Sequence, residues 1–254
     1  TDMEQKLSKK TRTESDLIGS REVPESALYG VQTLRGIENF RISKFHLNEY
    51  PLFIQALAIT KMGAAVANRE LDLLTEEQTD AILKACKEIL EGKHHDQFPV
   101  DMIQGGAGTT TNMNANEVIA NRALELMGHA RGEYHYCSPN DHVNRSQSTN
   151  DAYPTAIHIG LYYTHLKLVK HFATLIEAFR KKGAEFAHII KMGRTQLEDA
   201  VPMTLGQTFN GFASILEHEL KNLDFAAQDF LTVNMGATAI GTGITAEPEY
   251  AEKC

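Results

Sequence analysis

The chain has 254 residues, of which 42% are hydrophobic and 23% are charged, the composition of an ordinary globular protein. A formal net charge of -8 gives no general attraction to nucleic acid or to an anionic membrane, so neither is expected as a partner. The three cysteines are widely spaced and form no CxxC pair, which favours a reducing compartment. There is no apolar signal segment, and no run approaches the roughly 18 apolar residues of a membrane span, so we expect a cytoplasmic protein.

The first half of the chain carries three helical patterns. Residues 1 to about 15 are polar and are expected to form a mobile tail. From Pro51, apolar residues recur at spacings of three and four, which predicts a helix. A second helix is expected after Thr75, because acidic residues follow this threonine and Gly92 marks the far end. A third helix is expected from about Asn114 to Met127.

The second half of the chain carries much longer patterns. Pro154 suits a first helical position, and heptad-spaced apolar residues continue to Ile190. Such a helix of roughly 37 residues is about 55 Å long at about 1.5 Å per residue. Charged residues along one face exclude a membrane span. A further long helix is expected from about Leu205 to Val233.

Strand signals are sparse, and the predicted fold class is all-α. We expect a mostly helical N-terminal domain over residues 1–141 and an incomplete central helical-bundle domain over residues 142–254. Two long helices with wide apolar faces cannot bury those faces against each other alone. Further helices beyond Cys254, or other subunits, are expected to cover them, so we expect the chain to be truncated.

Three segments before the predicted helices share an unusual composition. Residues 105–114, 144–154 and 192–202 each combine Thr, Ser, Asn or Gln with a glycine or a proline. Helix capping explains any one of these side chains, but a cap needs one residue and each segment supplies three or four. Surplus donors beside a helix N-terminus make an anion site. Because the first two segments contain no lysine, the composition favours a carboxylate over a phosphate.

Other motifs of ligand binding are incomplete. The glycines near Gly106 lack the third glycine of a dinucleotide fingerprint, and no GxxxxGK[ST] occurs. The histidines stand at no metal-ligand spacing, and EHELKN lacks the second histidine of a zinc hydrolase. We therefore expect no metal site and no organic cofactor.

Four motifs carry a resemblance to a known family. The chain resembles the aspartase/class II fumarase superfamily in GGAGTTTNMNANEVIANRALELMG, PNDHVNRSQSTNDAYPTA, KMGRTQLEDAVPMTLGQ and NMGATAIGTG. Class II fumarases typically read Arg-Thr-His in the third of the three polar segments and Ser-Ser-Asn-Asp in the second. Here Gln196 follows Thr195 and Thr149 follows Ser148, which favours the aspartase branch. The resemblance covers nearly all of this chain and about the N-terminal half of an aspartase.

The resemblance implies a fold, an assembly and a reaction. The fold is the L-aspartase-like one, and the assembly is a homotetramer whose long helices form one central bundle, with each active site built from three subunits. The reaction is that of a carbon–nitrogen lyase: reversible anti elimination of ammonia from L-aspartate, through an enediolate, to give fumarate. By resemblance, the substrate would be held by Thr109, Ser148, Thr149, Asn150, Thr195 and Gln196. Some aspartases are activated by a divalent metal, but no residue here indicates such a site.

The family's catalytic base does not match any part of this sequence. It is a serine on a mobile loop, and in the family that loop lies beyond the position of Cys254. We therefore predict that this chain alone is inactive; fumarate formation from L-aspartate, followed by ultraviolet absorbance, would contradict this. Two alternatives stay open: a fumarase-type hydratase, in which water is the leaving group, and a non-catalytic helical scaffold fragment.

Overall fold

The computed structural model describes residues 10–106 and 108–254, which form two compact units. Residues up to 160 together with residues 233–254 make the first unit, and residues 161–232 make the second. The division into domains 1–141 and 142–254 stays a prediction.

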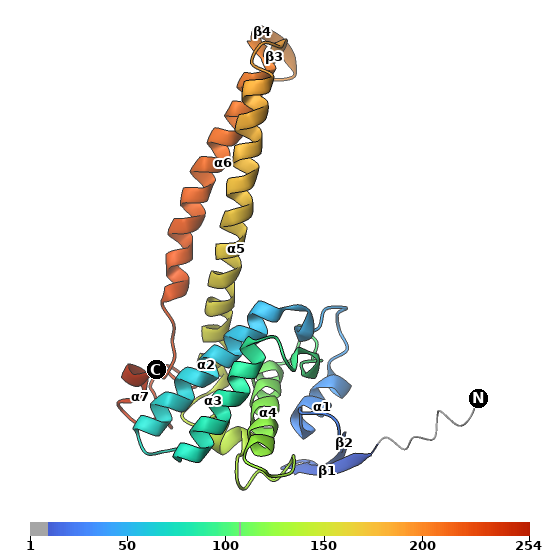
Figure 1. Ribbon diagram of the computed structural model, residues 1–254, viewed down its shortest axis with the longest axis vertical. Helices are drawn as coiled ribbons and strands as arrows, with labels where there is room; N and C mark the ends of the chain where they lie inside the picture. The colour runs from blue at the N-terminus through green and yellow to red at the C-terminus, as the bar shows by residue number, and fades with distance from the viewer. Residues whose placement is uncertain (1–9, 107) are drawn as a thin grey trace, which may run out of the picture. The chain divides into compact units, whose positions relative to one another are not determined.

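The first unit opens with an antiparallel hairpin and continues with helices (Figure 1). The hairpin pairs β1 (Thr11–Asp16) with β2 (Gly19–Pro24). The helices are α1 (Val31–Asn39), α2 (Pro51–Glu70), α3 (Glu76–Leu90), α4 (Thr109–Leu126), the start of α5 (Thr149–Glu185), and α7 (Tyr250–Lys253). Short 3₁₀ turns occur at Leu47–Glu49 and His95–Gln97, and a π turn at Pro139–Val143.

The main core lies between α2, α3 and α4, which pack side by side (Figure 1). Thr75 starts α3 with a capping box, because its hydroxyl accepts from the Gln78 N–H and the Gln78 side chain accepts from the Thr75 N–H. Each fully buried aliphatic side chain contributes about 1.5–3 kcal/mol. The largest of them are Leu47, Ile54, Leu57, Ile82, Ile89, Ile119 and Leu124.

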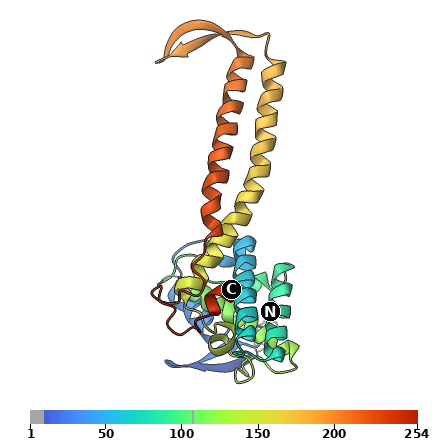
Figure 2. The same ribbon diagram turned by 90° about the vertical axis from the view of Figure 1, so that its left-hand side faces the viewer.

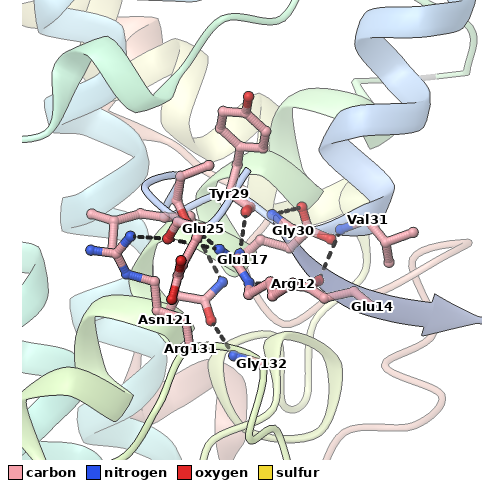
Figure 3. A network of polar contacts seen from close by, with 12 residues as sticks. Arg12, Glu14, Glu25, Tyr29, Gly30, Val31, Glu117, Asn121, Arg131 and Gly132 are labelled. Carbon is pink, nitrogen blue, oxygen red and sulfur yellow. Dashed lines mark hydrogen bonds and ion pairs between the residues drawn. The ribbon is translucent and has the colours of Figure 1, made fainter. Parts of the chain in front are cut away.

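A buried carboxylate fixes the start of α1 against α4 (Figure 3). Glu117 is 2% exposed and accepts hydrogen bonds of 2.8, 2.8 and 3.0 Å from three backbone N–H groups, those of Gly30, Gln32 and Thr33. Glu14 of β1 accepts a fourth, from the N–H of Val31. These N–H groups have no partner within the helix, so the two carboxylates satisfy them. Burial raises the pKa of Glu117, and hydrogen bonds from Thr33 and its neighbours oppose the shift.

The second unit contains the remainder of α5, a hairpin and α6 (Leu205–Ala227), followed by a 3₁₀ turn at Gln228–Leu231 (Figure 2). The hairpin pairs β3 (Ile190–Thr195) with β4 (Glu198–Thr204). Four rings join α5 to α6, those of Phe179, Phe186, Phe209 and Phe212. Many large apolar side chains of the unit stay exposed, among them Leu168, Leu175, Ile215 and Phe225. Within the described part of the chain, no helix is long and apolar enough to cross a membrane.

Two predicted N-terminal features are wrong. The tail expected over residues 1–15 includes β1 from Thr11, which pairs with β2; residues 1–9 lie outside the described residues. The helix expected from Asn114 begins at Thr109, so three threonines belong to its first turn instead of a loop. Gly108 caps this helix with φ +87°, a conformation that allows the chain to turn directly into it.

Three predictions about the long helices are also wrong. Pro154 lies inside α5, which begins five residues earlier at Thr149. Proline lacks the N–H that would bond to the carbonyl of Asn150, and the side-chain Nδ2 of Asn234 donates to that oxygen instead, at 3.1 Å. The segment 192–202 is a hairpin rather than a loop, so α5 ends at Glu185 instead of Ile190. The following helix ends at Ala227, not at Val233.

Candidate active site

The N-terminal ends of α4 and α5 meet in the first unit. A Cβ atom on Gly108 would lie 2.4 Å from the ring of Tyr153, so the absence of a side chain allows this close approach. The amide Nδ2 of Asn112, in the first turn of α4, donates to Oγ1 of Thr149, the first residue of α5, at 3.2 Å. The two polar segments that the sequence singled out therefore adjoin.

Four of the six predicted substrate-binding residues lie at this junction. Thr109 begins α4 and is exposed. Ser148 and Thr149 are half-buried, and Asn150 is exposed. The Ser148 hydroxyl accepts from the backbone N–H of Asn150 at 3.3 Å, so the three consecutive residues form one turn.

A buried lysine supports this junction from α2. Lys61 is 1% exposed, and its ammonium donates to three amide oxygens, at 2.7 Å to Asn112, 3.0 Å to Asn144 and 2.8 Å to Gln147. Burial lowers the pKa of Lys61 to about 7, and the Asp151 carboxylate opposes the shift. Lys61 was not among the residues predicted from the sequence. Its signal was one lysine between apolar residues in the stretch ALAITKMGAAVA.

A buried aspartate supports the junction from the other side. Asp151 is 0% exposed, and its Oδ1 accepts from the backbone N–H groups of Ser148 and Ala152 at 2.9 and 2.8 Å. Its Oδ2 accepts from those of Gly236 and Thr238 at 3.1 and 3.0 Å. The NMGATAIGTG segment is thereby fastened to the junction. This contact was not predicted from the sequence, although both segments belong to the motifs that carry the family resemblance.

The remaining two predicted residues belong to the second unit. Thr195 ends β3 and pairs with Glu198 of β4. Gln196 and Leu197 form the two-residue turn between them, with φ of 48° and 71°. All three residues of this Thr-Gln-Leu tip are exposed, Leu197 almost completely at 98%. The structure brings together the four residues of the first unit, and it places Thr195 and Gln196 side by side in the other.

The chemistry of the junction suits a carboxylate. Its first-unit side chains are hydroxyls and amides, and they stand at two helix N-termini, where partial positive charge gathers. Donors of this kind can hydrogen-bond an anion directly, while the buried Lys61 contacts amide oxygens of the junction. Among residues 10–106 and 108–254, no group of three or more His, Cys, Asp or Glu side chains is arranged to hold a metal ion.

The fold and the junction define a class of protein: a mostly helical fold with long helices that expose apolar side chains, and a helical unit in which hydroxyl and amide side chains lie at two helix N-termini. Residues 19–254 match the family described as Lyase, and the chain belongs to this family. The predicted superfamily and the mostly helical fold, with only short strands, are confirmed.

Two curated relatives are both named aspartate ammonia-lyase. The chain is 58% identical over 240 residues to the aspartate ammonia-lyase of Pseudomonas fluorescens, covering 94% of this chain and 50% of the relative. It is 54% identical over 246 residues to that of Escherichia coli (strain K12), covering 96% and 52%. The chain thus spans about half the length of the curated relatives it matches.

Two solved structures likewise match nearly all of this chain over about half of their own length. The cobalt-bound fumarate lyase:delta crystallin from Brucella melitensis superposes with a TM-score of 0.91 at 51% identity, over 96% of this chain and 53% of that one. The class II fumarase of Schistosoma mansoni superposes with a TM-score of 0.88 at 35% identity, over 96% and 51%.

Proposed function

We propose that the protein carrying this chain is an aspartate ammonia-lyase, which reversibly removes ammonia from L-aspartate to give fumarate. The observation that carries the proposal is 58% identity, over 94% of the chain, to a protein of that name. Identity to the class II fumarase is lower, at 35%, which favours the ammonia-lyase over the hydratase. Gln196, where class II fumarases typically have histidine, supports the same choice.

The proposed reaction explains why the donors are neutral. Removing a proton from C3 of aspartate places a second negative charge on the neighbouring carboxylate, which becomes an enediolate. Donors aimed at that carboxylate bind the intermediate more strongly than the substrate, so they lower the barrier. Each hydrogen bond to a charged group contributes roughly 1.5–3 kcal/mol. We propose this role for the first-unit residues Thr109, Ser148, Thr149 and Asn150, with Thr195 and Gln196 completing the site.

The elimination is balanced without an organic cofactor, because the proton goes to a base and the electron pair of the C–H bond expels ammonia. A divalent metal would then act as an activator, and no step here depends on one.

We propose a homotetramer with active sites shared between subunits. Support comes from the exposed apolar side chains of α5 and α6 in the second unit, since Leu175 is 45% exposed and Ile215 is 61% exposed. A long helix keeps such residues only where another helix covers them.

A substrate comparison with the full-length protein tests the function. L-aspartate and L-malate are supplied separately, and fumarate is followed by its ultraviolet absorbance. Formation from aspartate alone supports the ammonia-lyase, formation from malate alone supports the hydratase, and formation from neither supports a scaffold.

Two threonine-to-valine substitutions test the site. Thr149→Val and Thr195→Val keep the shape of the side chain but remove a donor, and each is expected to lower kcat/KM by about 10- to 100-fold. Thr79→Val is the matched control, because the hydroxyl of Thr79 donates only to the carbonyl of Thr75 within α3. If both site variants keep the rate of the control, these threonines are helix caps and hairpin residues only.

A further inference from the structure

The Asp151 carboxylate joins two segments that are far apart in the sequence. It is 0% exposed and accepts from four backbone N–H groups: that of Ser148 just before α5, that of Ala152 in its first turn, and two from the glycine-rich segment after α6. A carboxylate offers about four lone-pair sites and no hydrogen, so it satisfies all four donors. An amide of the same shape has acceptor sites on one side only.

Two further hydrogen bonds tie the same segments together, and both involve Asn150. Its Nδ2 donates to the carbonyl of Ala239 at 2.9 Å, and its own carbonyl accepts from Nδ2 of Asn234 at 3.1 Å. The second bond exists because Pro154 cannot donate to that carbonyl within α5. The candidate substrate-binding turn is therefore held on both sides by residues 234–239.

The conformation of residues 236–238 requires this attachment. Gly236 has φ +88°, and a Cβ atom there would lie 2.6 Å from the Cβ of Ala251. Thr238 has φ +56°, a region that β-branched residues rarely adopt. Strain of this kind persists only where the surroundings fix the backbone, and the N–H of Thr238 is bonded to Oδ2 of Asp151.

We propose that Asp151 is a positioning residue for substrate binding. Its charge does not touch the substrate; it fixes Ser148, Thr149 and Asn150 against residues 234–239, so that their donors face the substrate in one arrangement. The expected change in KM rests on the proposed function. The expected loosening of the two segments rests only on the contacts of Asp151.

The test is Asp151→Asn in the full-length protein, assayed for fumarate formation from L-aspartate. The new NH₂ group would face two N–H donors, either those of Gly236 and Thr238 or those of Ser148 and Ala152. A misplacement of about 1 Å costs about 100-fold, so we expect kcat/KM to fall by about that factor. Of this fall in kcat/KM, a factor of at least about 10 is expected to come from a rise in KM. Partial unfolding alone lowers the apparent kcat and leaves KM unchanged, so KM is the diagnostic quantity.

Glu117→Gln is the matched control. Glu117 is also a buried carboxylate in the first unit that accepts backbone N–H groups, but its partners lie at the start of α1. Both variants are expected to melt at lower temperature by circular dichroism, and only Asp151→Asn is expected to raise KM. An equal KM in both variants would show that Asp151 acts through general stability, and the proposal would be withdrawn.

A second measurement does not depend on catalysis. Amide hydrogen exchange of the full-length variants, followed by mass spectrometry, is expected to accelerate in residues 148–152 and 234–241 for Asp151→Asn and to stay at the wild-type rate there for Glu117→Gln. Unchanged exchange in Asp151→Asn overturns the proposal. A wild-type protein that makes no fumarate from aspartate overturns the proposed function instead, and the exchange result then decides the role of Asp151.

A milder variant covers the case in which Asp151→Asn does not fold. Asn234→Ala removes only the side-chain bond to the carbonyl of Asn150 and leaves the buried charge in place. One hydrogen bond of this kind corresponds to about a threefold rise in KM. A KM equal to that of the wild type would contradict the attachment that we propose.

Discussion

Replacing Lys61 by methionine is expected to change how stability depends on pH above neutrality. The ammonium is 1% exposed, and burial lowers its pKa from an ordinary value of 10.5 to about 7. Between these values the unfolded chain binds one more proton than the folded chain at this position. The free energy of unfolding therefore rises with pH over this window, by up to about 1.4 kcal/mol per pH unit.

The magnitude follows from the two pKa values and from the lost contacts. The pKa difference of about 3.5 corresponds to about 5 kcal/mol of stability gained between pH 7 and pH 10.5. Methionine does not titrate, so the variant lacks this gain. It also leaves two amide oxygens, Asn112 Oδ1 and Gln147 Oε1, without their donor, at about 1–3 kcal/mol each. Asn144 Oδ1 keeps a bond from Nδ2 of Asn112.

Urea unfolding of the full-length wild type and of Lys61→Met, followed by far-ultraviolet circular dichroism, measures the effect across this pH window. The variant is expected to be the less stable protein at the alkaline end, and the difference should shrink by about 1.4 kcal/mol per unit toward pH 7. Other titrating groups are common to both proteins and cancel. Parallel curves would refute the reasoning, because they would mean that Lys61 keeps its proton throughout.

Two further changes have defined outcomes. Gly108→Ala places a methyl group against the ring of Tyr153, in a backbone with φ +87°. This variant should have a lower melting temperature and a higher KM for L-aspartate. Gly63→Ala is the control: the new methyl group would have no atom nearer than 3.8 Å, so it should stabilise α2 by about 0.5–1 kcal/mol. Glu88→Gln removes the ion pair with Arg122, which lowers the pKa of Glu88 to about 2. Above pH 4.5 the variant should therefore be about 1–2 kcal/mol less stable than the wild type. Urea titrations should show this difference vanishing as the pH falls through 2.

The helices of the first unit were predictable where one local signal decided them. The helix expected after Thr75 and before Gly92 is α3, because a capping box and an apolar period of 3.6 act within a few residues. The start of α4 was not predictable in the same way. Threonine and asparagine are weak helix formers, but burial of Thr111 and Asn112 overrides that preference.

The β3–β4 hairpin was missed for a related reason. Its strands are almost entirely exposed, and apolar and polar residues alternate only over residues 190–192, a run too short to predict a strand. The turn has Gln196 and Leu197 at positive φ, where a two-residue hairpin turn usually has Asn-Gly. Neither the strands nor the turn carried the usual sequence signal.

The buried residues that support the candidate site could not be predicted from local sequence patterns. Lys61 reaches Asn112, which is 51 residues further along the chain, and Asp151 reaches Thr238, which is 87 residues further. Sequence composition identified which side chains are available as donors. Only the folded chain reveals which buried charges hold them.

Under the proposed function, the contacts of Lys61 explain how neutral side chains could stabilise a bound carboxylate. The Lys61 ammonium donates to Oδ1 of Asn112, and Nδ2 of the same amide donates to Oγ1 of Thr149. Each bond in such a chain polarises the next, so the charge strengthens the amide as a donor and the threonine hydroxyl in turn. The threonine hydroxyl, which accepts from this amide, still has its own hydrogen to donate. Under the proposed function, a proton on Lys61 would therefore act on a bound carboxylate through two neutral groups, and the deprotonated amine that predominates above pH 7 would not.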